Sequence, residues 1–248
     1  FGSRPFWLNV SAWGPTCCGS VEPFVEMPEE AVDLAEDEAD LDAKALAEAP
    51  RHALHNRWCL WVHQRPSSQK GAAWGEGQRL VHEFGTAEDF WCMFHHTYPP
   101  SKLENVDYSL FKSGVTPAWE DPAFKNGGRW VVKLEKVKAQ SLDDLWLSLS
   151  LALIGEAFFG HAGDLVCGAI VSVRSRASKI ALWLSAAKDE KKVLAIGREY
   201  RNVLASTPQL AEIATKELTF EDFRKQAVTF GLGRPHHANT EQTSGVFQ

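Results

Sequence analysis

Several features that mark common protein classes are missing from this 248-residue sequence. No apolar run approaches the roughly 18 residues that a membrane-spanning helix needs, so we expect no membrane partner. The five cysteines fit neither a disulfide framework nor a zinc motif, which predicts buried thiols in a reducing compartment and no metal site. No nucleophile–base pair or ligand cluster stands out, so we expect a protein that is not an enzyme and needs no cofactor.

Charge of both signs is present, but it is unevenly distributed. Residues 1–50 carry 11 acidic side chains against Arg4 and Lys44, with prolines throughout. This composition predicts a disordered N-terminal extension, which is either a regulatory arm or simply a solvated tail. Residues 51–248 carry 24 basic and 21 acidic side chains and are expected to form one domain. They lack the strong basic excess of a general duplex-binding protein.

Apolar periodicity predicts strands and helices that interleave along residues 51–248. Strands are expected at 57–64, 79–84, 108–112, 129–135, 166–173, 179–184 and within 213–220. Helices are expected after the start signatures at Thr86 and Ser141, and over residues 188–204. Consecutive strands leave no room for crossovers, which favours an α+β fold with an antiparallel sheet. Helices would pack on one face of this sheet and leave the other free for a ligand.

Tryptophan is abundant, with ten in the chain. Four tryptophans lie within periodic apolar segments, where burial in the core is expected: Trp58, Trp61, Trp130 and Trp146. Trp74 and Trp119 instead lie in polar loops beside glycine or proline. A loop tryptophan without apolar neighbours can present its ring face to a ligand.

Polar side chains suggest what that ligand could be. Glu120, next to Trp119, has two acceptor oxygens that fit the paired donors on the edge of guanine, although a solvated loop acid is the alternative. Basic residues near the ends of expected strands could hold a phosphate chain or simply be charged hairpin tips. These residues are Arg129, Arg174, Arg176 and Lys179.

The expected helix at 145–154 is apolar on more than one side. One stripe consists of Leu142, Leu145, Trp146, Leu149 and Leu153, and a second of Leu147, Leu151 and Ile154. A helix that is apolar all round is either buried or has a partner. Trp91 could join the second stripe to form a groove for a helical peptide.

Taken together, the motifs resemble the eukaryotic translation initiation factor 4E family. The resemblance covers roughly residues 51–245, with its segments in the right order and at compatible spacing. The segments are 52–61 (HALHNRWCLW), 86–91 (TAEDFW), 107–121 (DYSLFKSGVTPAWED), 127–130 (GGRW), 153–158 (LIGEAF), 167–169 (CGA) and 173–183 (VRSRASKIALW).

The resemblance implies a curved antiparallel sheet of about eight strands, backed on its convex face by three helices. The 7-methylguanosine cap of messenger RNA would bind on the concave face. Trp74 and Trp119 would stack on the base, Glu120 would read guanine, and Trp183 would pack near the N7 methyl group. The phosphate contacts implied are Arg129, Arg174 and Lys179.

The resemblance also implies a partner and a cellular role. A peptide of the 4G-type scaffold, or of inhibitory binding proteins, would bind a groove made of His52, Trp91, Leu147, Leu151 and Gly155. The protein would thereby bring capped messenger RNA to translation initiation in the cytoplasm, with room for a nuclear pool.

Departures from the family pattern leave alternatives open. Ala53 replaces a usual proline and Ala87 a usual valine, and both changes reduce the partner surface. The alternative function is therefore a cap-binding translational repressor that recruits no scaffold. Thr243 stands in place of a usual lysine, and Val246 in place of a regulatory serine, so we expect no phosphorylation there. A cap-modifying enzyme is a third class, which the lack of a catalytic cluster disfavours.

Overall fold

The structure, a computed structural model, describes residues 50–64, 77–135, 137–158, 163–206, 210–225 and 227–232. Within this part, residues 50–53 and 86–96 belong to one compact unit, and all other described residues belong to a second. The predicted N-terminal extension, the loop with Trp74, and Thr243 and Val246 lie outside the described residues.

An open sheet of eight strands dominates the second unit. The strands are β1 (Ala53–Gln64), β2 (Gln78–Thr86), β3 (Val106–Lys112), β4 (Gly128–Leu134), β5 (Val166–Ser172), β6 (Ser178–Leu184), β7 (Leu218–Asp222) and β8 (Ala227–Leu232). Their order is β2-β1-β3-β5-β6-β4-β7-β8. Pairing is antiparallel in β1–β3, β3–β5, β5–β6, β4–β6, β4–β7 and β7–β8. The predicted α+β fold with an antiparallel sheet is confirmed.

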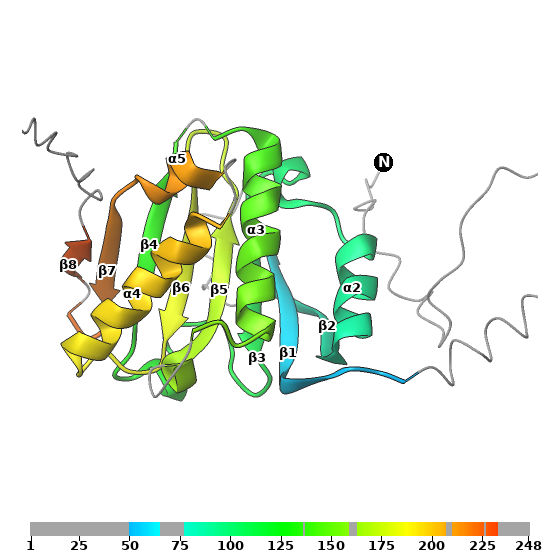
Figure 1. The fold of residues 1–248 in the computed structure, drawn as a ribbon, viewed down its shortest axis with the longest axis horizontal. Helices are drawn as coiled ribbons and strands as arrows, with labels where there is room; N and C mark the ends of the chain where they lie inside the picture. The colour runs from blue at the N-terminus through cyan, green and yellow to red at the C-terminus, as the bar shows by residue number, and fades with distance from the viewer. Residues whose placement is uncertain are drawn as a thin grey trace, which may run out of the picture. The chain divides into compact units, whose positions relative to one another are not determined.

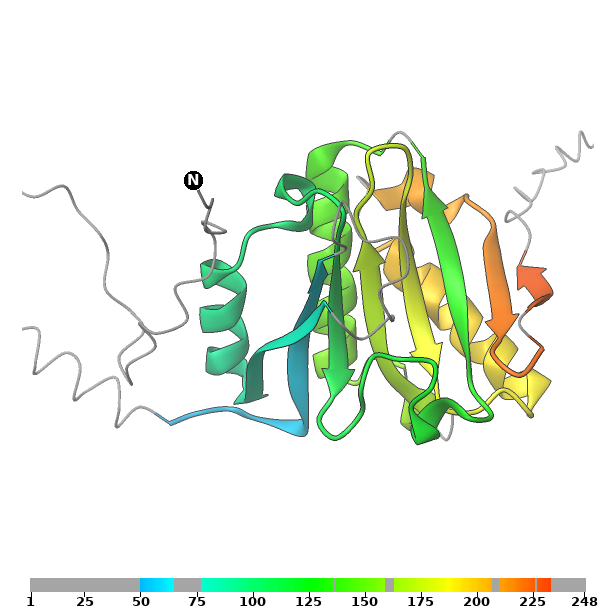
Figure 2. The same ribbon diagram turned by 180° about the vertical axis from the view of Figure 1, so that it is seen from behind.

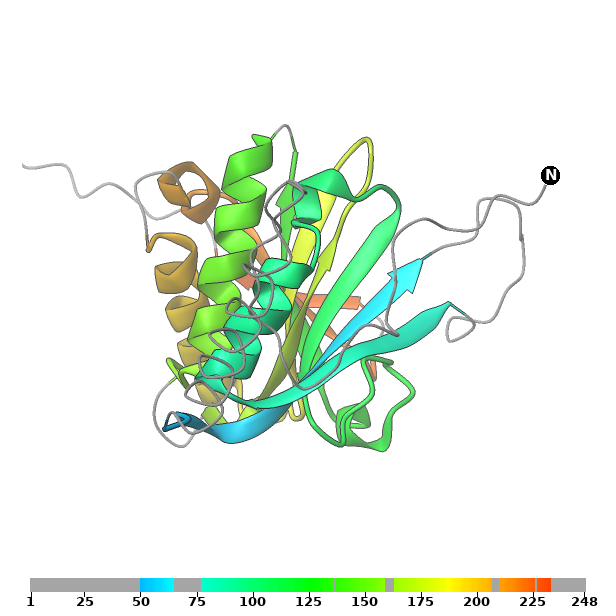
Figure 3. The same cartoon turned by 90° about the vertical axis from the view of Figure 1, so that its right-hand side faces the viewer.

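The helices are α2 (Ala87–His96), α3 (Ala139–Ile154), α4 (Glu190–Leu204) and the short α5 (Ala211–Ala214). Short 3₁₀ turns occur at η2 (Pro100–Lys102), η3 (Pro122–Phe124) and η4 (Gly163–Leu165). In the second unit, α3 and α4 run across one face of the sheet (Figure 1), and the view from behind shows the face that these two helices leave open (Figure 2). Figure 3 shows both helices on the same side of the strands.

Strand alternation assigns side chains to the two faces. On the covered face, Tyr108 of β3 stacks on Trp146 of α3, with ring centroids 6.4 Å apart. Trp130 of β4 donates its indole N–H to the carbonyl of Val193 in α4 at 3.0 Å. Residues one position along each strand, such as Asp107 and Arg129, therefore face the open side.

A glycine allows α4 to approach the sheet closely. A Cβ at Gly197 would lie 2.5 Å from the indole of Trp130, which is well inside contact distance. Glycine costs about 1 kcal/mol relative to alanine within a helix, so this close packing explains its presence in α4. The packing places Trp130 fully out of solvent.

Burial follows the sequence predictions in most places. Trp58, Trp130 and Trp146 are buried as predicted, whereas Trp61 is only half-buried. Burial also raises the pKa of the thiols of Cys59 and Cys167, which are free and buried as predicted.

Element boundaries differ from the predictions at several points. Helix α3 begins at Ala139 with no side-chain cap, so the predicted start at Ser141 was wrong. Asp144 of that predicted signature accepts a hydrogen bond from the side chain of Gln140 at 2.8 Å. Its neighbour Asp143 accepts two hydrogen bonds from Ser101, from the amide at 2.8 Å and from the hydroxyl at 2.6 Å. The predicted start at Thr86 is confirmed, because its hydroxyl accepts the amide N–H of Asp89 at 3.2 Å. The last strand was expected within 213–220, but α5 occupies part of that segment and β8 follows later.

None of the helices in the described ranges is both long and apolar enough to cross a membrane.

Candidate functional site

The open face of the sheet holds a pocket of about 420 Å³. Side chains from six strands, β1 to β6, and from the β5–β6 turn surround it. They are His63, Gln78, Asp107, Ser109, Arg129, Lys133, Ile170, Ser172, Arg174, Ala177, Ser178 and Lys179. The three basic residues that the sequence singled out as phosphate contacts, Arg129, Arg174 and Lys179, therefore lie together.

Two ion pairs fix the arginines of this pocket. Arg174 places one guanidinium nitrogen 2.8 Å from Oδ1 of the buried Asp107. Its other terminal nitrogen donates to the backbone carbonyls of Val106 at 3.2 Å and Val173 at 2.7 Å. Arg129 pairs with Glu221 of β7 at 2.6 Å. Both carboxylates are thus engaged by arginine.

Lysines provide the remaining positive charge. Lys133 of β4 and Lys179 of β6 are directly opposite each other in the β4–β6 ladder, and both side chains are exposed. Partial removal from water lowers the pKa of Lys179, as do the positive charges of Arg129 and Arg174; Glu221 and Asp107 act in the opposite direction. The pocket therefore has a surplus of positive charge suited to an anion.

An apolar cluster lies beside this charged region on the same face. It consists of Phe111, Phe124, Val131, Cys167, Ile170, Ala181 and Trp183, with Val115 and Phe223 packed against it. Trp183 is 1% exposed, and the guanidinium carbon of Arg129 lies 5.6 Å from its ring centroid. The indole N–H of Trp183 has no hydrogen-bond acceptor among the described residues. The open face thus changes from aromatic to cationic along β4 and β6.

The loop between β3 and β4 carries Trp119 and Glu120. Trp119 is 46% exposed and Glu120 is also exposed. Asp121 holds the loop in place, since its carboxylate accepts the amide N–H groups of Thr116 and Ala123, each at 2.9 Å. No described residue accepts the amide N–H of Trp119 or bonds the Glu120 carboxylate. The amide N–H and the ring face of Trp119 and the carboxylate of Glu120 are therefore all available to a ligand in this loop.

The loop is also connected to the pocket. Gln78 of β2 lines the pocket and donates its side-chain amide to the carbonyl of Pro117 at 3.5 Å. Pro117 is buried two residues before Trp119. Neither Trp119 nor Glu120 lines the pocket itself.

Helix α3 carries the residues predicted to contact a partner. Its first apolar stripe, from Leu142 to Leu153, is buried. In the second stripe, Leu151 is 39% exposed and Leu147 half-buried, whereas Ile154 is buried. Gly155 caps the helix with its N–H bonded to the carbonyl of Leu151 at 2.9 Å. Part of the second stripe thus remains open to a partner.

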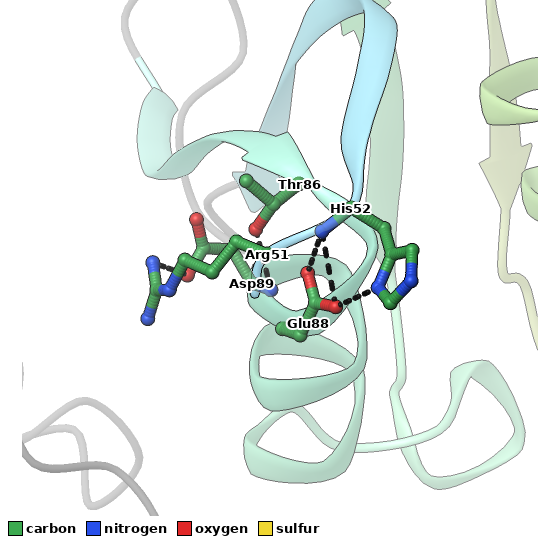
Figure 4. Close-up of polar contacts among 5 residues, drawn as sticks. All are labelled: Arg51, His52, Thr86, Glu88 and Asp89. Atoms are coloured by element: carbon green, nitrogen blue, oxygen red, sulfur yellow. Dashed lines mark hydrogen bonds and ion pairs between the residues drawn. The ribbon is translucent and has the colours of Figure 1, made fainter. Parts of the chain in front are cut away.

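His52 and Trp91, the other predicted partner residues, belong to the first unit. His52 contacts Glu88 twice, through its ring Nδ1 at 2.6 Å from Oε1 and through its amide at 3.0 Å from Oε2 (Figure 4). Arg51 pairs with Asp89 at 3.0 Å, and both acids lie in the first turn of α2. Trp91 is 39% exposed. The segment before β1 is therefore bonded to the N-terminal turn of α2.

Several pocket residues escaped the sequence reasoning. Asp107, Lys133 and His63 were not singled out, although all three lie on the open face. Strand alternation contained the signal: Lys133 is four residues from Arg129, and Asp107 lies opposite His63 in the β1–β3 register. His63 Nδ1 lies 3.5 Å from Oδ2 of Asp107.

Metal chemistry finds no support in the part of the chain that the structure describes. There, no group of three or more histidine, cysteine, aspartate or glutamate side chains is arranged to hold a metal ion.

Comparison with known proteins places this chain in one family. The family model described as "Eukaryotic initiation factor 4E" matches residues 53–229. Human eukaryotic translation initiation factor 4E is 41% identical over 175 residues, which cover 67% of this chain and 79% of that relative. The Drosophila melanogaster factor 4E1 is 39% identical over 202 residues, covering 79% and 76%.

A solved structure supports the same assignment. C. elegans eIF4E-3, in complex with the 4E-binding protein Mextli and a cap analog, superposes with a TM-score of 0.65 at 34% identity. The alignment covers 74% of this chain and all of the C. elegans chain. The chain belongs to the eukaryotic initiation factor 4E family.

Proposed function

We propose that the open face binds the 7-methylguanosine cap of messenger RNA, and that the protein brings this RNA to translation initiation through a scaffold partner. The observation that carries this proposal is the combination on one face of a cationic pocket and a neighbouring loop with an exposed tryptophan and an unpaired glutamate. The C. elegans relative, whose structure holds a cap analog, supports the ligand.

The methylated base would bind at the β3–β4 loop. Trp119 provides one stacking face, and Trp74, which lies outside the described residues, is proposed as the second from its place in the sequence. Methylation at N7 puts a positive charge on the ring, so each tryptophan face gains a cation–π attraction of about 0.5–2 kcal/mol. Stacking adds about 1–3 kcal/mol.

Glu120 would identify the base as guanine. Its two carboxylate oxygens can accept the ring N–H and the exocyclic amine, and the free N–H of Trp119 can donate to the guanine carbonyl. A cationic base is the stronger donor, so this pair would also favour the methylated form. Trp183, buried beside Arg129, would close the site near the methyl group.

The phosphates would then extend into the cationic pocket. Arg129, Arg174 and Lys179 line it together, and arginine held by a carboxylate on one side can still donate to phosphate on another. Binding of this kind requires no bond to be made or broken, which fits a carrier rather than an enzyme. We propose that the protein acts in the cytoplasm, and this role is compatible with a nuclear pool.

A helical peptide of a scaffold or inhibitory protein would bind the exposed stripe of α3. Leu151 and Leu147 present apolar surface there, which is the type of surface that amphipathic peptides use. The 4E-binding protein in the C. elegans complex supports a partner of this class. His52 and Trp91 stay predicted contributors.

The cap proposal is tested by tryptophan fluorescence quenching with 7-methyl-GTP and with GTP. We expect strong quenching by the methylated nucleotide, weak quenching by GTP, and loss of the difference in Glu120→Ala. Glu212→Ala is the matched control, because Glu212 is an exposed acid on α5 away from the pocket. Equal responses to both nucleotides in the wild type would refute the proposal.

The partner proposal needs a separate experiment. Binding of a fluorescent peptide from a 4E-binding protein should weaken at least tenfold in Leu151→Glu, with cap affinity unchanged. Leu80→Glu is the control, since Leu80 is 48% exposed but lies on β2. If both variants bound the peptide as the wild type does, the stripe on α3 would not be the partner surface.

A further inference from the structure

Two lysines stand directly opposite each other on the open face. Lys133 of β4 and Lys179 of β6 are register partners in an antiparallel ladder, and both line the pocket. Directly opposed positions on one face are close neighbours. Two flexible, positively charged side chains therefore start from the same level of the open face.

The nearby carboxylates are already paired with the arginines of the pocket. Asp107 is engaged by Arg174 at 2.8 Å, and Glu221 by Arg129 at 2.6 Å. Across the described residues, neither Lys133 nor Lys179 has an ion pair or a hydrogen bond. The two lysines are thus the cations of the pocket that remain available to an outside anion.

Their position along the strands defines which part of a ligand they can reach. In the β4–β6 ladder, Arg129 pairs with Trp183, Val131 with Ala181, and Lys133 with Lys179. Four residues of strand span about 13 Å. The lysine pair therefore lies well beyond the aromatic end of the face, where the base is proposed to bind.

We propose that Lys133 is a phosphate-binding residue and that, with Lys179, it forms a two-lysine clamp for the phosphates farthest from the methylated base. This inference rests on the proposed function for its ligand, the phosphate chain of capped RNA. A lysine ammonium is a compact charge on a flexible stem, so it binds phosphate without demanding one geometry. The two ammonium groups would together neutralise the end of the phosphate chain.

Lys133→Ala tests the clamp, with Lys191→Ala on the exposed face of α4 as the matched control. Affinity is measured for 7-methyl-GMP, 7-methyl-GTP and a short capped RNA at several salt concentrations. Lys133→Ala should bind the monophosphate like the wild type but lose three- to tenfold affinity for capped RNA at low salt. Its salt dependence should fall by about 0.7 in the slope of log K against log salt, the value for one phosphate contact in a single strand.

Two further measurements separate the possible failures. Lys133→Arg should restore the salt slope, and the unliganded Lys133→Ala protein should melt no lower than the wild type, because Lys133 is exposed and has no ion pair or hydrogen bond among the described residues. An unchanged slope with intact cap binding would overturn the clamp alone. The wild type could bind methylated and unmethylated nucleotides equally well, yet bind 5′-triphosphate RNA more tightly than Lys133→Ala does. That result would support the clamp and refute the cap proposal.

Discussion

The two faces of the sheet differ in what lies against their side chains. On the covered face, Trp130 is fully buried and its N–H reaches a carbonyl of α4. On the open face, Trp183 is just as buried, yet its N–H has no acceptor among the described residues, and two lysines oppose each other nearby. Helices cover one face, whereas the other carries the exposed lysines of the pocket, which have no ion pair among the described residues. Stability and binding should therefore respond to different residues.

The largest expected effect comes from the covered face. Trp130→Ala removes a fully buried indole and should lower the free energy of unfolding by about 3–5 kcal/mol. Urea denaturation measures this loss. Trp119→Ala is the contrasting variant, because Trp119 is 46% exposed: its stability should change by no more than about 0.5 kcal/mol. Equal destabilisation by both variants would break the comparison between the faces.

A smaller effect is expected from the ion pair beneath the pocket. Arg174→Ala leaves Asp107, 6% exposed, without its main partner, and should cost about 2–3 kcal/mol of stability. Adding Asp107→Asn to this variant should recover most of the loss, since the amide carries no charge. Thermal melting of the wild type and of both variants measures this; equal melting temperatures for the single and double variants would mean that the unpaired charge of Asp107 is not the cause of the loss.

The smallest effect is expected at an exposed pair in the first unit. Hydrogen bonding to the His52 side chain holds the pKa of Glu88 at about 2, against an ordinary 4.5. A carboxyl with a lowered pKa in the folded state stabilises above its unfolded pKa, and this contribution is lost as pH falls from about 4.5 to 2. Glu88→Gln should therefore lose less free energy of unfolding than the wild type as the pH falls from 4.5 to 2. At pH 7 its free energy of unfolding should remain close to that of the wild type.

Urea unfolding of Glu88→Gln at pH 7, 4.5, 3 and 2 measures that slope. Glu212→Gln, at an exposed position on α5, should keep the wild-type slope. If Glu88→Gln and the wild type lost stability equally between pH 4.5 and 2, Glu88 would not titrate with a lowered pKa.

The covered face was the more predictable of the two from sequence. Apolar alternation identified most strands, and the buried stripe of α3 followed from helical spacing. Boundaries were harder: α3 begins two residues before Ser141, and Asp144 of the predicted signature accepts a hydrogen bond from the side chain of Gln140 at 2.8 Å. A local signature does not show which partner a side chain will bond once the helix has formed.

The open face was only partly predictable. Trp119 and Glu120 stood out because loop residues without apolar neighbours are conspicuous. Lys133 and Asp107 did not, since each looks like an ordinary charged residue within or beside a strand. Only the register, which brings Lys133 opposite Lys179 and Asp107 within reach of Arg174, gives them a role. Pairing between distant strands is the information that a single sequence does not display.

The bracing of Arg174 has a consequence for the entropy of binding. Its guanidinium is already held by Asp107 and by two backbone carbonyls before any ligand arrives. Ordering a long side chain on association costs about 0.5–1.5 kcal/mol, and a side chain fixed in advance avoids most of that cost. Lys133 and Lys179 have no such restraint and must lose rotamer freedom when they close on phosphate. The pocket thus combines two arginines that are held by carboxylates with two unrestrained lysines, so the arginines can position a ligand while the lysines adapt to its shape.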